Sequence, residues 1–457
     1  MNVSLRNLNN IFLIFAISHL IIWTLVPSLT NNNLPLDTIE ALAWSSNLDW
    51  GYNKHPPLSA FAVEIFYIIF GRQDWAFYLL SQIFIITAFV TIFKLAREFF
   101  KDAHLAFISL ILLEGIFFFN YTTPEFNVNV SQIPFWALSV YFTWRCIKND
   151  KVSDFVLLGL FLGLGFLSKY LFIYLIIGIK TLFIYLFFKK KINSYNFLIA
   201  GLVSLAIIFP HLIWLVENNF ITLTYGLQRT GTSNELINHI INPIIFILKQ
   251  IGILSPFFLL IIFLIKKIKL KRIIFNEKII FLIFTFVIPL ILMLLTSILI
   301  GGKIRTMWMT PFYLLIGITF VEILKNNIYL NNLRKFYFFF LFIFLLSPIA
   351  YASVSLINDY KRTDYPGKEI ARLVQNKWDD NFINEIKIVV GDEWSAGNLS
   401  YHLYSRPIWI NDLKDKTSNI NEDQGVIYTG NPKILKQICP GVFGTINPVG
   451  YCMIGRR

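Results

Sequence analysis

Long apolar runs recur along this chain and limit its possible folds more than any other feature. Of its 457 residues, 56% are hydrophobic and only 15% are charged, whereas soluble domains carry about 25% charged residues. A helix that crosses a bilayer needs about 20 mostly apolar residues. Eleven segments meet this description, of which 155–169 is the shortest: 9–27, 75–94, 105–120, 128–146, 155–169, 170–188, 196–216, 244–265, 279–300, 307–324 and 336–356. We therefore predict a mainly α-helical, polytopic membrane bundle.

Basic residues gather in the short segments between these runs. The five clusters lie within 94–101, 145–151, 189–191, 266–272 and 325–335. Cytoplasmic loops carry an excess of Lys and Arg, so we expect the N-terminus and all five loops on the cytoplasmic side. This bias explains the net charge of +13 without nucleic-acid binding. Segments 28–74 and 217–243 and the C-terminal region then lie outside.

The apolar stretch 57–70 is an exception to the spanning pattern. It begins with Pro56-Pro57 and is followed by Gly71-Arg72. Counting it as a span would place the cluster at 94–101 outside, so we expect an interfacial or re-entrant helix on the outer face. The first apolar segment lacks a small-residue cleavage site after it, which favours a retained helix over a signal peptide.

The last hundred residues have a different composition. Residues 357–457 contain Asp, Lys, Asn and Gly at soluble-domain frequency. We predict a helix over 366–378 and short strands at 386–390, 408–410 and 426–428. The expected division is therefore a bundle over 1–356, with an outer loop over 28–74, and a small α/β domain over 357–457. Cys439 and Cys452 have a spacing compatible with a disulfide if this region faces an oxidising compartment.

The first outer loop holds an unusual density of polar and aromatic residues. Asp37 and Glu40 are three residues apart, so on a helix they share one face. Asp37 is also a candidate N-cap of that helix. Ionisable groups at a membrane face are costly and mark functional sites.

The pattern of this loop resembles a known family. Asp37-x-x-Glu40-Ala-x-x-Trp44, followed by Trp50-Gly51-Tyr52-x-Lys54-His55-Pro56-Pro57-Leu58, is similar to the first outer loop of GT-C glycosyltransferases. These enzymes include protein O-mannosyltransferases, aminoarabinose-lipid A transferases and lipopolysaccharide-core galacturonosyltransferases. Weaker similarities cover most of the remaining chain, at 123–127, 163–170, 210–214, 229, 302–311, 391–397 and 405–407. Glu125 departs from the family, where an aspartate is commoner.

The resemblance implies sugar transfer from a polyprenyl-phosphate-linked donor at the outer membrane face. A carboxylate is needed as base for the acceptor hydroxyl; we assign this role to Asp37, with Glu40 or Glu125 as positioning or second acidic groups. The leaving lipid phosphate needs cations, for which the candidates are Lys54, Lys169, Lys303 and Arg305. Arg229 either binds phosphate or caps a loop, and snorkelling is the alternative for Lys169.

Aromatic residues complete the expected substrate site. Trp44, Trp50, Tyr52 and Trp308 are candidates for stacking on a sugar or lining a prenyl groove, although Trp and Tyr favour membrane interfaces in any case. His55 is expected to position substrate by hydrogen bonding, and Tyr170 follows from the Ser168-Lys169-Tyr170 motif.

The resemblance leaves cofactor and acceptor open. No Cys/His metal-ligand spacing occurs in the sequence, and a divalent cation is used by only some GT-C enzymes. An envelope glycolipid such as lipid A or lipopolysaccharide core is the expected acceptor, at the periplasmic face of a bacterial inner membrane. The alternatives are a protein O-glycosyltransferase of the same fold and a flippase or transporter of lipid-linked sugars. A transporter would be expected to have two symmetry-related halves, and no such repeat is visible.

Overall fold

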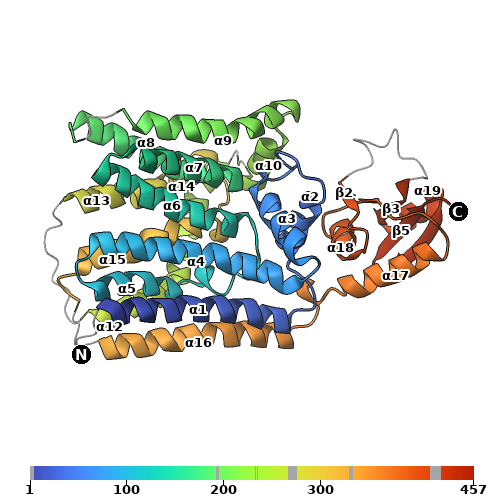
Figure 1. Ribbon diagram of the computed structural model, residues 1–457, viewed down its shortest axis with the longest axis horizontal. Helices are drawn as coiled ribbons and strands as arrows, with labels where there is room; N and C mark the ends of the chain where they lie inside the picture. The colour runs from blue at the N-terminus through green and yellow to red at the C-terminus, as the bar shows by residue number, and fades with distance from the viewer. Residues whose placement is uncertain are drawn as a thin grey trace.

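The protein is a helical bundle with a small sheet domain at one end (Figure 1). The computed structural model describes residues 5–191, 195–231, 233, 235–265, 275–328, 333–411 and 424–457, with side chains from residue 8 onward. The α-helices of the bundle are α1 (Leu5–Thr30), α4 (Asp74–Phe99), α5 (Ala103–Ile111), α6 (Val128–Asn149), α7 (Val152–Ser168), α8 (Ile173–Phe188), α9 (Phe197–Glu217), α11 (Asn238–Ile253), α12 (Ser255–Leu264), α13 (Glu277–Leu282), α14 (Ile288–Ile300), α15 (Ile316–Leu324) and α16 (Leu333–Ile357). Short 3-10 or π segments extend several of them: η1 (Leu112–Gly115), η2 (Phe117–Phe119), η3 (Tyr170–Phe172), η4 (Ile283–Val287), η5 (Thr306–Met309) and η6 (Pro311–Leu315).

A helical segment lies at each of the eleven predicted spans, but not all are full-length apolar helices. Seven of the described helices are long and apolar enough to cross a membrane, and the bent pair α11–α12 would make eight. The segments predicted at 105–120 and 155–169 fold as shorter apolar helices. The helix at 128–146, α6, is long enough but less apolar, because it buries polar residues such as Gln132 and Thr143.

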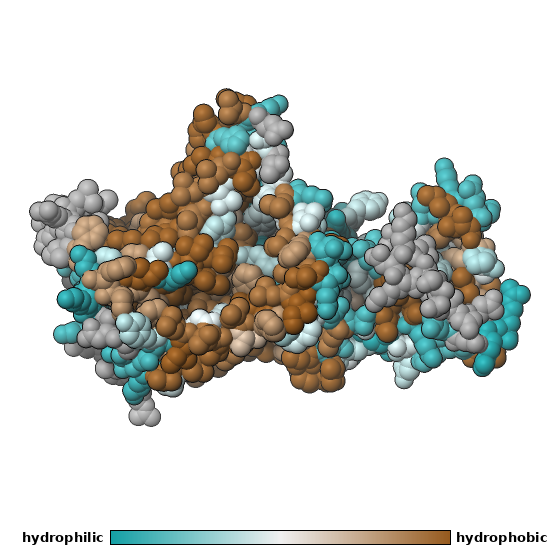
Figure 2. Space-filling view, turned by 90° about the horizontal axis from the view of Figure 1, so that it is seen from above, coloured by the Kyte–Doolittle hydropathy of each residue, from teal (hydrophilic) through white to brown (hydrophobic). Residues whose placement is uncertain are grey.

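The outer surface agrees with a multi-pass membrane protein. Figure 2 shows a hydrophobic surface over the middle of the molecule and hydrophilic residues concentrated toward its two ends. Large apolar side chains are exposed along α1, α9, α11 and α16, as lipid-facing helices require.

Two contacts bring two of the basic loops, 94–101 and 145–151, to the start of α13. Lys148 pairs with Glu277 at 2.7 Å, and the ammonium of Lys278 donates to the carbonyl oxygen of Phe99. The N-terminus lies at the same end of the bundle, and the sheet domain lies beyond the opposite end (Figure 1). Which side of the membrane this end faces stays a prediction, and the basic cluster at 266–272 lies outside the described residues.

Two short helices lie between the bundle and the sheet domain (Figure 1): α2 (Leu36–Ser45) and α3 (Leu58–Phe70). With 13 residues, α3 is about 20 Å long and too short to span a bilayer. It ends at Gly71, whose positive φ of 66° favours glycine. This agrees with the non-spanning helix expected at 57–70. A third short helix at this end is α10 (Ile221–Thr230).

The C-terminal region forms a mixed sheet with the strand order β2-β1-β3-β5-β4. Its elements are η8 (Arg362–Asp364), α17 (Gly367–Asp379), β1 (Ile388–Val390), α18 (Ser395–His402), β2 (Ile408–Ile410), β3 (Val426–Gly430), α19 (Pro432–Ile438), β4 (Val442–Ile446) and β5 (Val449–Ile454). Strand β1 pairs in parallel with β2 and β3, and β5 pairs antiparallel with β3 and β4. The predicted helix and three strands are confirmed. A disulfide joins Cys439 to Cys452 of β5.

A hydrophobic core crosses from the outer loop into the sheet domain. It combines Ala43, Trp44 and Tyr52 with Val374 and Trp378 of α17, among others. The division of the chain at residues 356 and 357 stays a prediction, because this core draws on both sides of it.

Candidate active site

Helix α2 places the two acidic residues of the first outer loop. Its N-cap is Pro35, so the N-cap alternative for Asp37 is wrong and Asp37 lies in the first helical turn. The backbone N–H of Asp37 donates to Oε1 of Glu125 at 3.2 Å. Glu125 is fixed in turn because Asn127, two residues later, caps α6 by accepting from the backbone N–H groups of Asn129 and Val130. Residues 88 positions apart therefore meet at one end of the bundle.

One turn after Asp37, Glu40 takes part in a three-residue ion cluster. The ammonium of Lys54 lies 2.9 Å from Glu40 and 3.0 Å from Glu393 of the sheet domain. The amide of Asn53 also donates to Glu393, at 3.1 Å. Lys54, predicted as a phosphate ligand, is thus already paired with two carboxylates.

Burial raises the pKa of all three carboxyl groups on the bundle side of the site. The pKa of Asp37 is raised because burial outweighs the attraction of nearby cations, of which Lys169 is the strongest. Burial raises the pKa of Glu40 to about 7 despite its ion pair with Lys54. The pKa of Glu125 is raised to about 8 by burial and then by the negative charge of Asp37. The Glu125 carboxyl group therefore holds a proton at neutral pH. As a result, it does not place a full negative charge beside Asp37.

Lys169 lies at the end of α7 and points into the protein. It is only 6% exposed. Its ammonium donates to Oδ1 of Asn129 and lies 5.1 Å from the ring centre of Trp308. Burial lowers its pKa to about 7, although the charge of Asp37 opposes this. The side chain does not extend to the surface, as snorkelling would require.

The other predicted cations lie on exposed positions beside Lys169. Lys303 and Arg305 are exposed, and the backbone N–H of Lys303 donates to the carbonyl oxygen of Thr230 at the end of α10. This contact brings segment 301–305 next to the turn that carries Arg229. The charge of Arg305 acts on Lys169, and the charge of Arg229 acts on Asp37. Lys169 and Arg229 therefore act on Asp37 directly, and Arg305 lies close enough to act on Lys169.

The predicted aromatic ligands divide into two groups. Trp44 and Tyr52 are buried and stacked on each other, with ring centres 5.3 Å apart. His55 packs edge-on against Trp44 and against Tyr225 of α10, and burial lowers its pKa to about 3, so it is neutral at physiological pH. Trp50, by contrast, is 43% exposed. Trp50 and the half-buried Trp308 are therefore the rings with free surface in this structure.

A second chain of contacts fixes the loop between α2 and α3. The hydroxyl of Tyr170 contacts Nε2 of His211 at 2.8 Å, and Nδ1 of His211 contacts the carbonyl oxygen of Trp50 at 2.6 Å. Gly51 lies flat against Trp214, so a Cβ there would be 2.3 Å from the indole ring. Tyr170 thus acts on the loop through His211.

The sequence reasoning missed three residues that shape the site, Asn129, Arg362 and Glu393. Glu393 belongs to a segment that resembled the family, but nothing in its spacing pointed to Lys54. Arg362 follows the last span, and its charge acts on both Asp37 and Glu125. Among the residues whose structure is described, no group of three His, Cys, Asp or Glu side chains could hold a metal ion.

Comparison with known proteins shows which family this chain resembles. Residues 54–214 match the family described as dolichyl-phosphate-mannose-protein mannosyltransferase. Over 206 residues, the chain is 22% identical to the lipopolysaccharide core galacturonosyltransferase RgtA of Rhizobium johnstonii, covering 45% of this chain and 41% of that protein. Over 226 residues, it is 24% identical to the lipid A galacturonosyltransferase RgtD of the same organism, covering 48% and 46%. The matches span less than half the length of these relatives.

The fold is similar to a solved structure over nearly its whole length. ArnT from Cupriavidus metallidurans, in a crystal structure with bound undecaprenyl phosphate, superposes with a TM-score of 0.66 at 13% identity, covering 98% of both chains. The apo structure of the same protein gives a TM-score of 0.54 at 12% identity, covering 97% of this chain and 98% of ArnT. The resemblance found in the sequence is therefore confirmed: the chain is similar to this family over residues 54–214, and it shares the fold of ArnT over nearly its whole length.

Proposed function

We propose that this protein transfers a sugar from a polyprenyl-phosphate-linked donor to an envelope glycolipid, such as lipid A or lipopolysaccharide core. One observation carries the proposal: Asp37, Glu40 and Glu125 gather at one end of the bundle and face a group of cations that includes Lys169. A glycosyl transfer from a lipid phosphate needs this pair of features, a base for the acceptor and positive charge for the leaving group.

Asp37 is the base in this proposal. Glu40 is occupied by Lys54, and Glu125 is protonated at neutral pH and accepts the Asp37 backbone N–H. Asp37 remains half-buried, with Lys169 as the strongest influence in favour of its ionised form. The acceptor oxygen attacks the anomeric carbon, its proton passes to Asp37, and the bond from that carbon to the phosphate oxygen breaks.

The cations on the other side receive the leaving phosphate. Lys303 and Arg305 are exposed for this contact, and an Arg can bind two phosphate oxygens at once. Lys169 stabilises the developing charge from its buried position. Trp50 and Trp308 are the rings we assign to the sugar or to the prenyl chain, while Lys54, His55 and Tyr170 hold the loop that carries Trp50.

The periplasmic face of a bacterial inner membrane is the proposed location. The disulfide between Cys439 and Cys452 supports it, because disulfides persist in oxidising compartments. The sheet domain lies beside α2, the helix that contains Asp37 (Figure 1).

Mass spectrometry of envelope lipids tests the proposal. Lipids from cells that lack the protein are compared with those from cells that carry the wild type, Asp37→Asn or Asp49→Asn. Asp49 is an exposed acid of the same loop and serves as the matched control. General bases contribute roughly a hundredfold to ten-thousandfold in rate, so Asp37→Asn should lose the transferred sugar while Asp49→Asn retains it.

The same comparison separates the alternatives. Donor lipid that accumulates on the inner leaflet, with no sugar moved to an acceptor by the purified protein, would identify a flippase. A sugar missing from envelope proteins, with lipids unchanged, would identify a protein O-glycosyltransferase. Wild-type transfer by Asp37→Asn would remove Asp37 as the base.

A further inference from the structure

An open cavity reaches Glu125 from the side of the sheet-domain linker. This cavity, of about 300 Å³, is lined by Leu36, Tyr121, Glu125, Tyr351, Lys361 and Arg362, among others. Its walls come from four parts of the chain: the start of α2, the loop before α6, α16, and the segment that joins α16 to the sheet domain. Lys169, Lys303 and Arg305 are absent from its lining.

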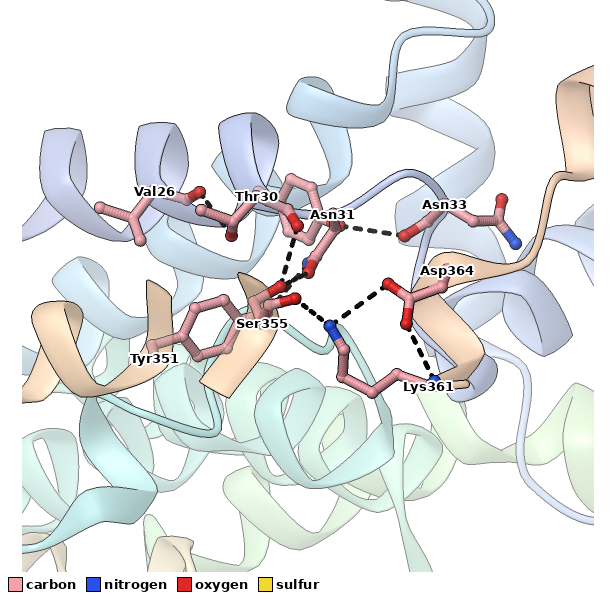
Figure 3. Close-up of polar contacts among 9 residues, drawn as sticks. Val26, Thr30, Asn31, Asn33, Tyr351, Ser355, Lys361 and Asp364 are labelled. Atoms are coloured by element: carbon pink, nitrogen blue, oxygen red, sulfur yellow. Dashed lines mark hydrogen bonds and ion pairs between the residues drawn. The ribbon is translucent and has the colours of Figure 1, made fainter. Parts of the chain in front are cut away.

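Within the part of the chain that the structure describes, Arg362 is the cation of this cavity that has no carboxylate partner. Figure 3 shows Lys361 between Asp364 and the backbone of Ser355, and its ammonium lies 3.2 Å from Asp364. The guanidinium of Arg362 is exposed and has no carboxylate within 4.0 Å among the residues that the structure describes. Its positive charge acts on both Asp37 and Glu125. Because the pKa of Glu125 is raised to about 8, that side chain does not neutralise Arg362 at neutral pH.

The wall that carries Arg362 is held in place. The backbone N–H groups of Asn32 and Asn33 both donate to the carbonyl oxygen of Thr363, each at 2.9 Å. The amide of Asn31 donates to the hydroxyl of Tyr351 at 2.9 Å, and the hydroxyl of Ser355 donates to Asn31 at 2.8 Å (Figure 3). These contacts tie the linker to the ends of α1 and α16, so the cavity is formed before any ligand arrives.

We propose that this cavity is the acceptor subsite and binds an acidic sugar headgroup of the acceptor glycolipid, with Arg362 paired to its phosphate or carboxylate. The inference rests on the proposed function. Attack on the anomeric carbon opposite to the leaving group requires donor and acceptor to approach from different sides. The cations at Lys169 and Arg305 take the donor phosphate, so the acceptor enters from the side of Arg362 and Glu125. Tyr121 and Tyr351 supply a polar and aromatic wall suited to a sugar ring.

Binding of diphosphoryl lipid A to the full-length protein in nanodiscs tests this subsite, with dephosphorylated lipid A as the second ligand. Charge-assisted pairs in a formed site contribute strongly to affinity. Arg362→Gln should therefore weaken binding of the diphosphoryl form about tenfold to a hundredfold and leave the dephosphorylated form unchanged. Arg372→Gln removes an exposed arginine of α17 by the same change and serves as the control. Thr122→Trp, which fills the cavity from its rim, should weaken both ligands.

Two further ligands, undecaprenyl phosphate and glucosamine 1-phosphate, are measured in the same binding experiment. Arg362→Gln should bind undecaprenyl phosphate as the wild type does, because the donor cations lie elsewhere. Equal lipid A affinity in Arg362→Gln and Arg372→Gln would overturn the subsite. Arg362-dependent binding of glucosamine 1-phosphate as tight as that of lipid A would overturn the glycolipid assignment in favour of a soluble sugar phosphate. A wild type that binds lipid A through Arg362 but transfers no sugar would refute the proposed function instead.

Discussion

Two neighbouring regions of the outer end, loop 46–57 and segment 301–308, carry the same kinds of residue but are built in opposite ways. In the loop, Lys54 is paired with Glu40 and Glu393, and Tyr52 stacks on Trp44. In the segment, Lys303 and Arg305 extend their side chains to the exposed surface. The sequence assigned both regions to substrate binding.

This difference separates positioning from binding. A lysine held between two carboxylates must break both ion pairs before it can neutralise a phosphate. Such a lysine is therefore poorly suited to bind the phosphate of an incoming donor. An exposed cation at a membrane face is free to attract a lipid phosphate without first losing a carboxylate partner. We therefore expect loop 46–57 to determine the stability and shape of the site, and segment 301–308 to determine donor affinity.

Lys169 lies between the two regions, and its replacement should have the largest effect. Transfer requires Asp37 without a proton and Lys169 with one. The pKa of Asp37 is raised and that of Lys169 is lowered to about 7. In the free protein, kcat/KM should therefore fall at low pH as Asp37 is protonated, and fall above about pH 7 as Lys169 loses its proton.

Two variants at Lys169 test the acid and the alkaline limb of this pH profile separately. Lys169→Met removes the cation that favours ionised Asp37, so the acid limb should move to higher pH and kcat/KM at pH 7 should drop about a hundredfold. Lys169→Arg keeps its charge and should extend activity to higher pH. A pH profile of Lys169→Met that matches the wild type would show that Lys169 acts on neither step.

The double variant Lys303→Ala/Arg305→Ala should have the next largest effect. Loss of two phosphate contacts should raise the KM for the polyprenyl-phosphate donor about tenfold. The thermal midpoint should not change, since both side chains are exposed. Donor titration with purified protein at two salt concentrations measures this, because exposed charges are screened by salt. Unaltered donor affinity would contradict the division between the two regions.

Lys54→Met should affect stability more than donor affinity. Removing Lys54 leaves Glu40 and Glu393 without their shared cation, at a cost of about 1–3 kcal/mol, and donor affinity should change by less than about threefold. The pKa of Glu40 is already raised from 4.5 to about 7, so folded Glu40 keeps a proton that the unfolded chain releases. Its contribution to stability is present at low pH and lost as the pH rises through about 7.

Without Lys54, ionised Glu40 has no cation beside it, so the stability lost as the pH rises should be larger. The thermal midpoint of Lys54→Met in detergent should therefore fall further below the wild type at pH 8 than at pH 6. Lys303→Met makes the same change at an exposed position and should match the wild type at both pH values. A Lys54→Met midpoint equal to that of Lys303→Met would mean that the ion cluster does not stabilise the fold.

The sequence predicted the helical bundle because hydrophobic length alone identifies most of its helices. It also predicted three of the five strands, whereas β4 and β5 were missed because Gly444 and Gly450 interrupt their apolar pattern. Asp37 and Glu40 could be related through one helix, but their partners could not. Glu393 lies more than 300 positions from Lys54, and no local pattern encodes a contact at that separation.

The core shared by α2 and the sheet domain restricts how this protein can change over evolutionary time. Gly397 of α18 packs so closely on α2 that a Cβ there would lie 3.1 Å from the Cβ of Ala43. Trp44 and Tyr52 complete the interior of a domain encoded more than 300 residues later. A substitution on this face of α2 must therefore be matched by one in the sheet domain, and recombination between relatives that replaces only one of the two parts would yield a protein with an incomplete interior.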